Sequence, residues 1–249
     1  CIVAVLISGT SIAFANLGDS RAVYCSLEAS ALPSEDDTAS PDFFVETTTR
    51  QISVDHKASD ASEAAAVRTQ SGDQNAIRPS KSEGVDGQPR VAGSLAVTRT
   101  FGDFYLKYPE FCQDEDIKPH LPYLLEHPFV SSCSIDTTSS INGCSSESRP
   151  NSRRCSFIVM ASDGLWDHLS NEQVTTCVSR HLAQSGLRDS SIDAETPVDA
   201  LMYLLFQTVA AKHDTTTSAL LKLQEGRRRH LFDDTTISII ILDGILQWS

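Results

Sequence analysis

The sequence contains no long apolar stretch. No run of about 18 apolar residues occurs among the 249 residues, so we expect no transmembrane helix. The apolar opening, Cys1 to Ile7, has neither a basic flank nor a cleavage pattern, and it is too short for a signal peptide. The chain also begins with Cys and not with Met. A strand-like apolar run at residue 1 indicates that the chain starts inside a domain.

Positive charge is scarce. Lys and Arg together number 20 against 33 Asp and Glu, which gives a net charge of −13 and a pI near 4.8. A general nucleic-acid binder or a membrane-surface protein needs a basic face, so we expect neither kind of partner. The single basic cluster, Arg227 to His230, is interpreted as a solvated loop.

Paired cysteine motifs are absent as well. The seven cysteines form no C-x-x-C pair and no Cys/His zinc spacing, and their odd number argues against a complete disulfide framework. Cys1, Cys25, Cys155 and Cys177 have apolar neighbours, where a buried thiol is the ordinary state. This pattern favours a reducing compartment, and we expect an intracellular, cytoplasmic protein.

The overall composition is that of a globular protein, with 40% hydrophobic and 21% charged residues. We expect one domain over residues 1–249, interrupted by three polar insertions. The second insertion holds nine serines and has no apolar periodicity. The insertions are expected at about residues 26–49, 131–154 and 213–230.

Strand and helix patterns occur in groups along the chain and do not alternate strictly, which favours an α+β fold. Asp60 with Glu63 and Ser170 with Gln173 have the spacing of helix capping boxes, and Gly72 can end the first helix. We expect strands at 2–7, 12–15, 21–25, 157–161 and 235–242, and helices at 59–71, at 171–184 and from residue 197.

Three acidic turns adjoin apolar strands. They contain Asp19, Asp163 with Asp167, and Asp233. Converging carboxylates repel one another unless a cation lies between them, and oxygen ligands suit Mg²⁺, Mn²⁺ or Ca²⁺. Taken singly, each Asp is also explained by ordinary turn chemistry. The residues alone therefore leave a metal site and plain turns as alternatives.

The order of motifs resembles that of the type 2C family of metal-dependent serine/threonine protein phosphatases. ASDGLWD and RVAGSLAVTRTFGD are specific to that pattern, whereas GDSR alone would be weak. A calcium-binding or adhesive β-sandwich would not explain the second of these segments. The matching segments are ANLGDSRAV (Ala15 to Val23), SVDHKASDASEAAAVRTQSG (Ser53 to Gly72), RVAGSLAVTRTFGD (Arg90 to Asp103), FIVMASDGLWDHLSNEQV (Phe157 to Val174) and DDTTISIII (Asp233 to Ile241).

The resemblance implies an antiparallel β-sandwich with helices on both outer faces and a two-metal site at one end. By position, Asp163 and Asp233 resemble ligands of the catalytic Mg²⁺ or Mn²⁺ pair, and Asp19 and Asp167 resemble ligands of a third, weaker ion. The implied reaction is hydrolysis of phosphoserine or phosphothreonine in a phosphoprotein substrate by a metal-activated water. A monomer is expected, and no cysteine is required as a nucleophile.

Other residues within the motifs are expected to support the fold without a chemical role. His56 is interpreted as part of a hydrogen-bond network, and Trp166 as a core residue. Arg99, Gly102 and Asp103 are interpreted as scaffold residues beneath the site.

The sequence departs from the family pattern in three places. Asp233 is followed by Asp234 where the family has Asn, and Ser71 precedes Gly72 where a second Gly is common. The Asp-Gly-His-Gly-Gly segment, which supplies a metal-bridging Asp and a proposed general acid, does not occur. We therefore expect that the N-terminal third of the domain is missing and that residues 1–249 alone are inactive. A pseudophosphatase or phosphoprotein-binding scaffold without turnover remains the alternative.

Overall fold

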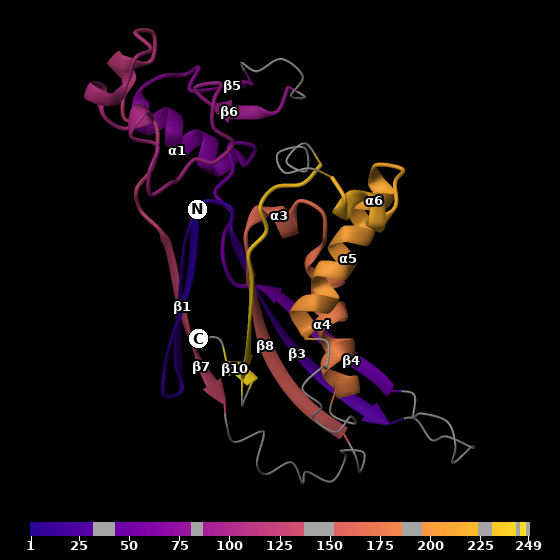
Figure 1. Cartoon of the computed structure of the whole chain (residues 1–249). Coiled ribbons are helices and arrows are strands. Elements are labelled where there is room, and N and C mark those ends of the chain that lie inside the picture. Colours follow the sequence, from indigo (N-terminus) through magenta and orange to yellow (C-terminus); the bar gives the residue numbers. More distant parts are fainter. Residues whose placement is uncertain are drawn as a thin grey trace. The chain divides into compact units, whose positions relative to one another are not determined.

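The protein is described by a computed structural model, in which the chain forms two compact units (Figure 1). Unit 1 contains residues 1–5, 14–20 and 53–131, and unit 2 contains residues 6–13, 21–52 and 132–249. The structure describes residues 1–31, 43–80, 87–136, 152–185, 196–223, 231–242 and 245–247.

Unit 2 is built on a four-stranded antiparallel sheet. Its strand order is β4-β3-β8-β9, and its two central strands run side by side over ten residue pairs, with Val23 opposite Val159. Residues 157–159 of β8 are fully buried because the strand is apolar on both faces. The strands are β3 (Arg21–Ala31), β4 (Phe43–Gln51), β8 (Ser152–Ala161) and β9 (Ile237–Leu242).

Two long helices cover this sheet. They are α4 (Asn171–Ser185), which contacts β3 and β4, and α5 (Pro197–Lys212), which contacts β9, and both lie along the same side of the sheet (Figure 1). A shared core forms where Val174 and Val178 of α4 and Leu201 of α5 are fully buried. Two shorter helices, α3 (Asp163–Trp166) and α6 (Thr217–Leu221), complete the unit.

The helix starts follow from local sequence. The predicted capping box at α4 is confirmed, because the Ser170 hydroxyl accepts from the Gln173 N–H and the Gln173 side chain accepts from the Ser170 N–H. At α5, Thr196 and Asp199 form a second capping box, and Pro197 occupies the first turn. Short-range hydrogen bonds thus fix where both helices begin.

Unit 1 contains the helix α1 (Ala61–Ser71), a small hairpin and three short 3-10 helices. Asp60 caps α1 by accepting the N–H groups of Ser62 and Glu63, and Gly72 ends it in the left-handed conformation, with φ of 67°. The hairpin is β5 (Ile77–Pro79) with β6 (Pro89–Val91). The short helices are η1 (Phe104–Leu106), η2 (Pro109–Phe111) and η3 (Lys118–His120).

A second four-stranded sheet has the order β1-β2-β7-β10. Its strands are β1 (Ile2–Ser8), β2 (Ser11–Leu17), β7 (Phe129–Asp136) and β10 (Ile245–Gln247). Sheets with antiparallel pairing together with separate helices confirm the expected α+β class. No helix in the described part of the chain is long and apolar enough to cross a membrane.

The first predicted insertion is wrong over most of its length. Residues 26–31 belong to β3 and residues 43–49 belong to β4, and the two strands pair from Ser26 opposite Thr48 to Ala31 opposite Phe43. The threonine-rich run Thr47 to Thr49 lacks apolar alternation but has high strand propensity, and pairing with β3 satisfies its backbone. Residues 32–42 lie outside the described residues.

The other two insertions are partly described. Residues 131–136 continue β7 and residues 152–154 begin β8, so these ends of the second insertion are strands, contrary to the prediction. In the third, residues 217–221 form α6, capped by the Thr216 side chain, where a polar connection was expected. Residues 137–151 and 224–230 lie outside the described residues, and the final predicted strand begins at Ile237 rather than Thr235.

Candidate metal-binding residues

Asp163 follows the end of β8, a central strand of the sheet in unit 2. Strand β8 ends at Ala161, Ser162 is extended, and α3 begins at Asp163. The Asp163 carboxylate accepts a hydrogen bond of 3.0 Å from the Gly164 N–H. Because β8 is paired on both sides and buried, the backbone that leads to Asp163 is held in place by the core.

Ser162 holds the loop before β9 against the end of β8. The Ser162 N–H donates to the Thr236 carbonyl at 3.1 Å. Its hydroxyl donates to the Asp234 carbonyl at 3.1 Å and accepts from the Thr236 N–H at 3.0 Å. Three hydrogen bonds therefore join segments that are more than 70 residues apart in sequence.

Gly164 allows the same loop to approach α3 closely. A Cβ at this position would lie 2.6 Å from Thr235 Oγ1, 2.8 Å from the Asp234 carbonyl oxygen and 2.9 Å from the Asp233 carbonyl oxygen. Such distances are too short for any side chain, so only glycine fits here. The backbone of Asp233 therefore lies beside the first turn of α3, next to Asp163.

The remaining acids of the candidate site occupy different settings. Asp233 is exposed, and its carboxylate accepts a 2.8 Å hydrogen bond from the Asp234 N–H. Asp167 follows α3, its N–H donates to the Asp163 carbonyl at 2.9 Å, and its side chain is exposed. A spacing of four residues across one helical turn places Asp163 and Asp167 on the same side of α3.

Asp19 belongs to unit 1. It follows Gly18, which has φ of 103°, and it is 7% exposed. Its carboxylate accepts a 2.9 Å hydrogen bond from the Cys1 thiol and lies 4.0 Å from the Lys57 ammonium group. The structure thus brings the loops of Asp163, Asp167 and Asp233 together within unit 2 and places Asp19 in unit 1.

The donor atoms fit a hard cation, although they are few. Carboxylate and backbone carbonyl oxygens are the ligands that Mg²⁺ and Mn²⁺ prefer. Over the ranges that the structure describes, no group of three or more His, Cys, Asp or Glu side chains could hold a metal ion. Asp163 and Asp233 are therefore candidates for only part of a coordination shell.

The comparison with protein families identifies the fold around these acids. The family model described as Protein phosphatase 2C matches residues 1–201. The chain belongs to the protein phosphatase 2C family. All of Asp19, Asp163 and Asp167 lie within the matched residues, whereas Asp233 lies beyond them.

Curated plant proteins of the 2C family are similar along nearly the whole chain. "Probable protein phosphatase 2C 36" of Oryza sativa subsp. japonica is 30% identical over 243 residues, covering 98% of this chain and 53% of the rice protein. "Probable protein phosphatase 2C 68" of Arabidopsis thaliana is 28% identical over 247 residues, covering 99% of this chain and 54% of that protein. The chain spans about half the length of the curated relatives that it matches.

A solved 2C structure supports the fold. The serine-threonine phosphatase 2C from Toxoplasma gondii superposes with a TM-score of 0.50 at 17% identity, covering 96% of this chain and 56% of that chain. Identity this low shows the shared fold alone. It agrees with the α+β arrangement of antiparallel sheets described above.

In this 2C family member, His56 supports the turn that carries Asp19 through hydrogen bonds with Gly18. The Gly18 backbone N–H donates to the His56 ring Nδ1 at 3.1 Å, and the His56 backbone N–H donates to the Gly18 carbonyl at 3.0 Å. Burial lowers the pKa of His56, and the nearby Arg99 guanidinium lowers it further. His56 is 1% exposed, and this burial favours the neutral imidazole.

Arg99, which the sequence predicted as a scaffold residue, forms an ion pair with Glu63. The Arg99 guanidinium donates two hydrogen bonds to the Glu63 carboxylate, and the Thr98 hydroxyl donates a third at 2.6 Å. Glu63 therefore does not complete the capping box expected with Asp60. Its carboxylate turns away from the helix start because a bidentate guanidinium partner binds it more strongly.

Sequence reasoning missed the residues that hold the acids in place. Ser162 and Gly164 lie in the same Ser-Asp-Gly turn as Asp163, yet their contacts with residues 233–236 depend on tertiary packing. Cys1 was expected only to be buried, but it is exposed and donates to Asp19. Trp166, by contrast, is 7% exposed and packs in the core, as expected.

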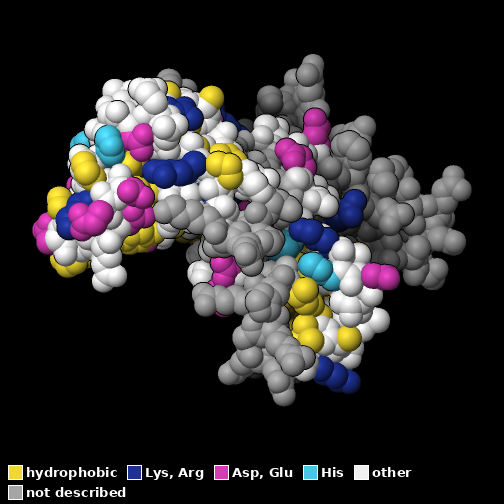
Figure 2. Space-filling model, turned by 90° about the horizontal axis from the view of Figure 1, so that it is seen from above, with side chains coloured by type: hydrophobic (Ala, Val, Ile, Leu, Met, Phe, Trp, Pro, Cys, Tyr) yellow, Lys and Arg dark blue, Asp and Glu magenta, His cyan; other side chains and the backbone are white. Residues whose placement is uncertain are grey.

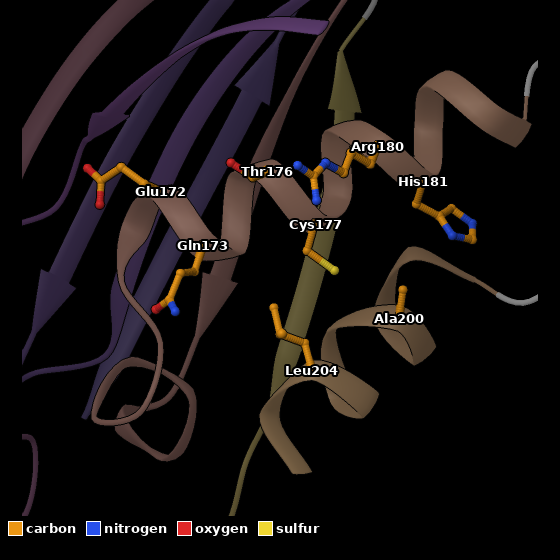
Figure 3. Close-up of a pocket in the computed structure, with 8 residues that line it drawn as sticks. All are labelled: Glu172, Gln173, Thr176, Cys177, Arg180, His181, Ala200 and Leu204. Atoms are coloured by element: carbon orange, nitrogen blue, oxygen red, sulfur yellow. The ribbon is translucent and has the colours of Figure 1, made fainter. Parts of the chain in front are cut away.

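A separate pocket opens between α4 and α5 and has a volume of about 600 Å³. The side chains of Cys177 and Leu204 point into the space between the helices (Figure 3). None of the four candidate aspartates lines it. The pocket is therefore distinct from the acidic site.

Proposed function

We propose that the protein is a metal-dependent serine/threonine phosphatase, in which Asp163 and Asp233 bind the catalytic Mg²⁺ or Mn²⁺ pair. Asp167 and Asp19 are proposed as ligands of an additional, weaker ion. The observation that carries the proposal is the close approach of Gly164 to residues 233–235, which keeps the two carboxylate-bearing turns adjacent. Family membership supports the reaction class.

The proposed chemistry is hydrolysis of a phosphate ester. When bound, the metal ions supply Lewis acidity toward the phosphate and activate water for attack on phosphorus. The chain's own contribution is positional. Ser162 fixes the distance between the two turns through its three hydrogen bonds, and the buried strand β8 holds the backbone that leads to Asp163. Neither role requires movement during the reaction, which suits a preorganised site.

Units 1 and 2 are proposed to form one phosphatase domain, because the family match over residues 1–201 includes segments of both. The substrate is proposed to be a phosphoprotein and the protein a monomer. A reducing, intracellular location, with the cytoplasm as the expected compartment, is supported by six described cysteines that are all free thiols. The matched relatives are about twice as long as this chain, and we propose the phosphatase activity for the whole protein.

The test measures Mn²⁺-dependent phosphate release from a phosphothreonine peptide by the full-length protein. Asp163→Asn is expected to lower the rate by about a hundredfold or more and Asp167→Asn by about tenfold, because each removes an oxygen charge near the metals. Asp214→Asn is the matched control, since Asp214 is exposed and both residue types tolerate its left-handed backbone.

A second readout separates metal binding from turnover. Mn²⁺ titration followed by calorimetry should show weaker binding for Asp163→Asn and unchanged binding for Asp214→Asn. Wild-type rates for Asp163→Asn and Asp167→Asn would show that the assigned metal roles are wrong. Tight binding of Mn²⁺ and phosphopeptide without phosphate release would favour the non-catalytic scaffold.

A further inference from the structure

Unit 1 carries a cluster of exposed aromatic side chains, the aromatic patch, formed by Phe104, Tyr108 and Phe111. Their ring centroids lie 5.9 Å apart for Phe104 and Tyr108, 5.7 Å for Phe104 and Phe111, and 6.5 Å for Tyr108 and Phe111. The three side chains are 51%, 40% and 56% exposed, in chain order. They form one continuous apolar surface over η1 and η2.

The three rings are exposed although unit 1 has a packed hydrophobic core of its own. Leu106 and Cys112, which lie between and beside the aromatic residues, are buried in the core of unit 1 together with Tyr123. Leu106 of η1 and Cys112, which follows η2, therefore face the core, whereas the three rings face outward. Exposed apolar surfaces of this kind in a folded unit are typical of binding sites.

Carboxylates border the aromatic patch. The Tyr108 hydroxyl donates to Glu126 at 3.2 Å, and the charge of Glu126 raises the pKa of Tyr108, with Glu110 adding to the effect. Glu110 is exposed, and Glu126 is 57% exposed at its side chain. Figure 2 shows acidic and hydrophobic side chains next to one another on the surface of unit 1.

One of the two border carboxylates is paired with a lysine. The buried Lys107 ammonium group lies 3.5 Å from the Glu126 carboxylate and donates to the Thr100 carbonyl at 2.8 Å. Lys118 pairs with Glu115 at 3.0 Å. Residues 101–120 contain five acidic residues and two lysines, so the segment that carries the aromatic patch has a net negative charge.

We propose that the aromatic patch docks a segment of the phosphoprotein substrate in which Lys or Arg residues alternate with apolar residues. This inference rests on the proposed phosphatase function and names the substrate class that the protein would select. A partner cation would lie against a ring face while the exposed Glu110 attracts its charge. The apolar side chains of the segment would cover Phe104 and Phe111.

Binding is tested with the full-length protein and an unphosphorylated fluorescein-labelled peptide of alternating Arg and Leu, by fluorescence anisotropy. Phe111→Ala is expected to weaken binding by about tenfold, the usual size for an aromatic anchor. Glu110→Gln is expected to weaken binding by about threefold. It should also make binding less sensitive to salt, because it removes a carboxylate whose attraction for the cationic peptide is screened by salt. Tyr203→Ala is the matched control, because Tyr203 is also 56% exposed but lies on α5.

Phosphatase kinetics provide an independent test of the docking proposal. With a phosphothreonine peptide that carries the Arg-Leu segment, Phe111→Ala should raise KM by about tenfold and leave kcat unchanged. With p-nitrophenyl phosphate, which has no docking segment, Phe111→Ala should match the wild type. If the wild type releases no phosphate from either substrate, the proposed function fails, and the inference that the occupant is a substrate fails with it.

Three results would overturn the docking proposal while leaving the phosphatase function intact. The first is equal affinity of wild type and Phe111→Ala for the Arg-Leu peptide, with circular dichroism showing both folded. The second is equal affinity for that peptide and its Glu-Leu analogue. The third is concentration-dependent self-association in sedimentation velocity that Phe111→Ala abolishes, since a second copy of the chain would then be the occupant.

Discussion

Gly164 sets how closely the two acid-bearing turns of unit 2 can approach. It is buried, its position leaves no room for a Cβ, and the atoms in the way are mostly backbone carbonyl oxygens. Backbone cannot be displaced as easily as the end of a flexible side chain. The absence of a side chain at Gly164 therefore lets the backbone of Asp233 lie close to the Ser-Asp-Gly turn that carries Asp163.

Gly164→Ala is expected to separate the turns, lower Mn²⁺ affinity and destabilise the protein by about 1–3 kcal/mol, the usual cost of overpacking. Calorimetric Mn²⁺ titration and thermal unfolding would measure both effects. The matched control is Gly102→Ala, because a Cβ at Gly102 meets no atom within 4 Å. Unchanged Mn²⁺ affinity in Gly164→Ala would contradict the proposal that the close contact of the two turns supports metal binding.

At the scale of single elements, α4 is positioned by its cap and by its contact with the sheet. Ser170→Ala removes the hydroxyl that accepts from the Gln173 N–H and should destabilise the protein by about 1 kcal/mol. Urea unfolding would measure this loss. Ser218→Ala in α6, an exposed serine inside a helix, should change stability by much less.

Two titratable residues, His56 beside the turn at Gly18 and Glu63 in α1, predict how the stability of unit 1 changes in acid. Burial lowers the pKa of His56 below its ordinary value of 6.5, so the unfolded chain binds the proton more readily. For Glu63, burial raises the pKa, but hydrogen bonds from Arg99 and Thr98 outweigh it and hold the pKa below 4.5. Both groups therefore stabilise the folded state more at neutral pH than in acid.

We expect the unfolding free energy to fall as pH drops below 6.5 and to fall further as pH drops below 4.5. Hydrogen exchange of unit 1 amides between pH 7 and pH 5 would detect the first step. His56→Asn should flatten that step, because Asn carries no titrating group, whereas His213→Asn, at an exposed position, should leave it unchanged. A first step of the same size in His56→Asn would contradict the assignment to His56.

At the scale of the whole molecule, we predict that residues 1–249 supply too few metal ligands for full activity. Hard cations need about six oxygen ligands, and the sequence contains no Asp-Gly-His-Gly-Gly segment to supply the bridging Asp of the family pattern. Residues 1–249 on their own are therefore expected to release little phosphate from a phosphothreonine peptide with Mn²⁺. The Toxoplasma gondii serine-threonine phosphatase 2C is a suitable positive control, and a comparable rate from the two proteins would contradict this expectation.

Local features were predicted well and long-range ones poorly. The helices α1, α4 and α5 begin where Asp60, Ser170 and Pro197 indicated, because a cap depends on residues three apart. The pairing of β3 with β4 was missed, because the threonine-rich residues of β4 show no alternation and gain their strand structure from a neighbour. The turns of Asp163 and Asp233 were predicted as candidates, whereas the contacts that hold them together were not.

The sequence by itself determined the family, the α+β class, the helix starts and the acidic turns, since these depend on motif order and on hydrogen bonds between near neighbours. Tertiary structure decided which turns lie together. Ser162 and Gly164 meet residues 233–236 only after β8 and β9 have paired, because a hydrogen bond or a steric limit exists only at contact distance. It likewise decided that Phe104, Tyr108 and Phe111 face solvent, because Leu106 and Cys112 fill the core beneath them.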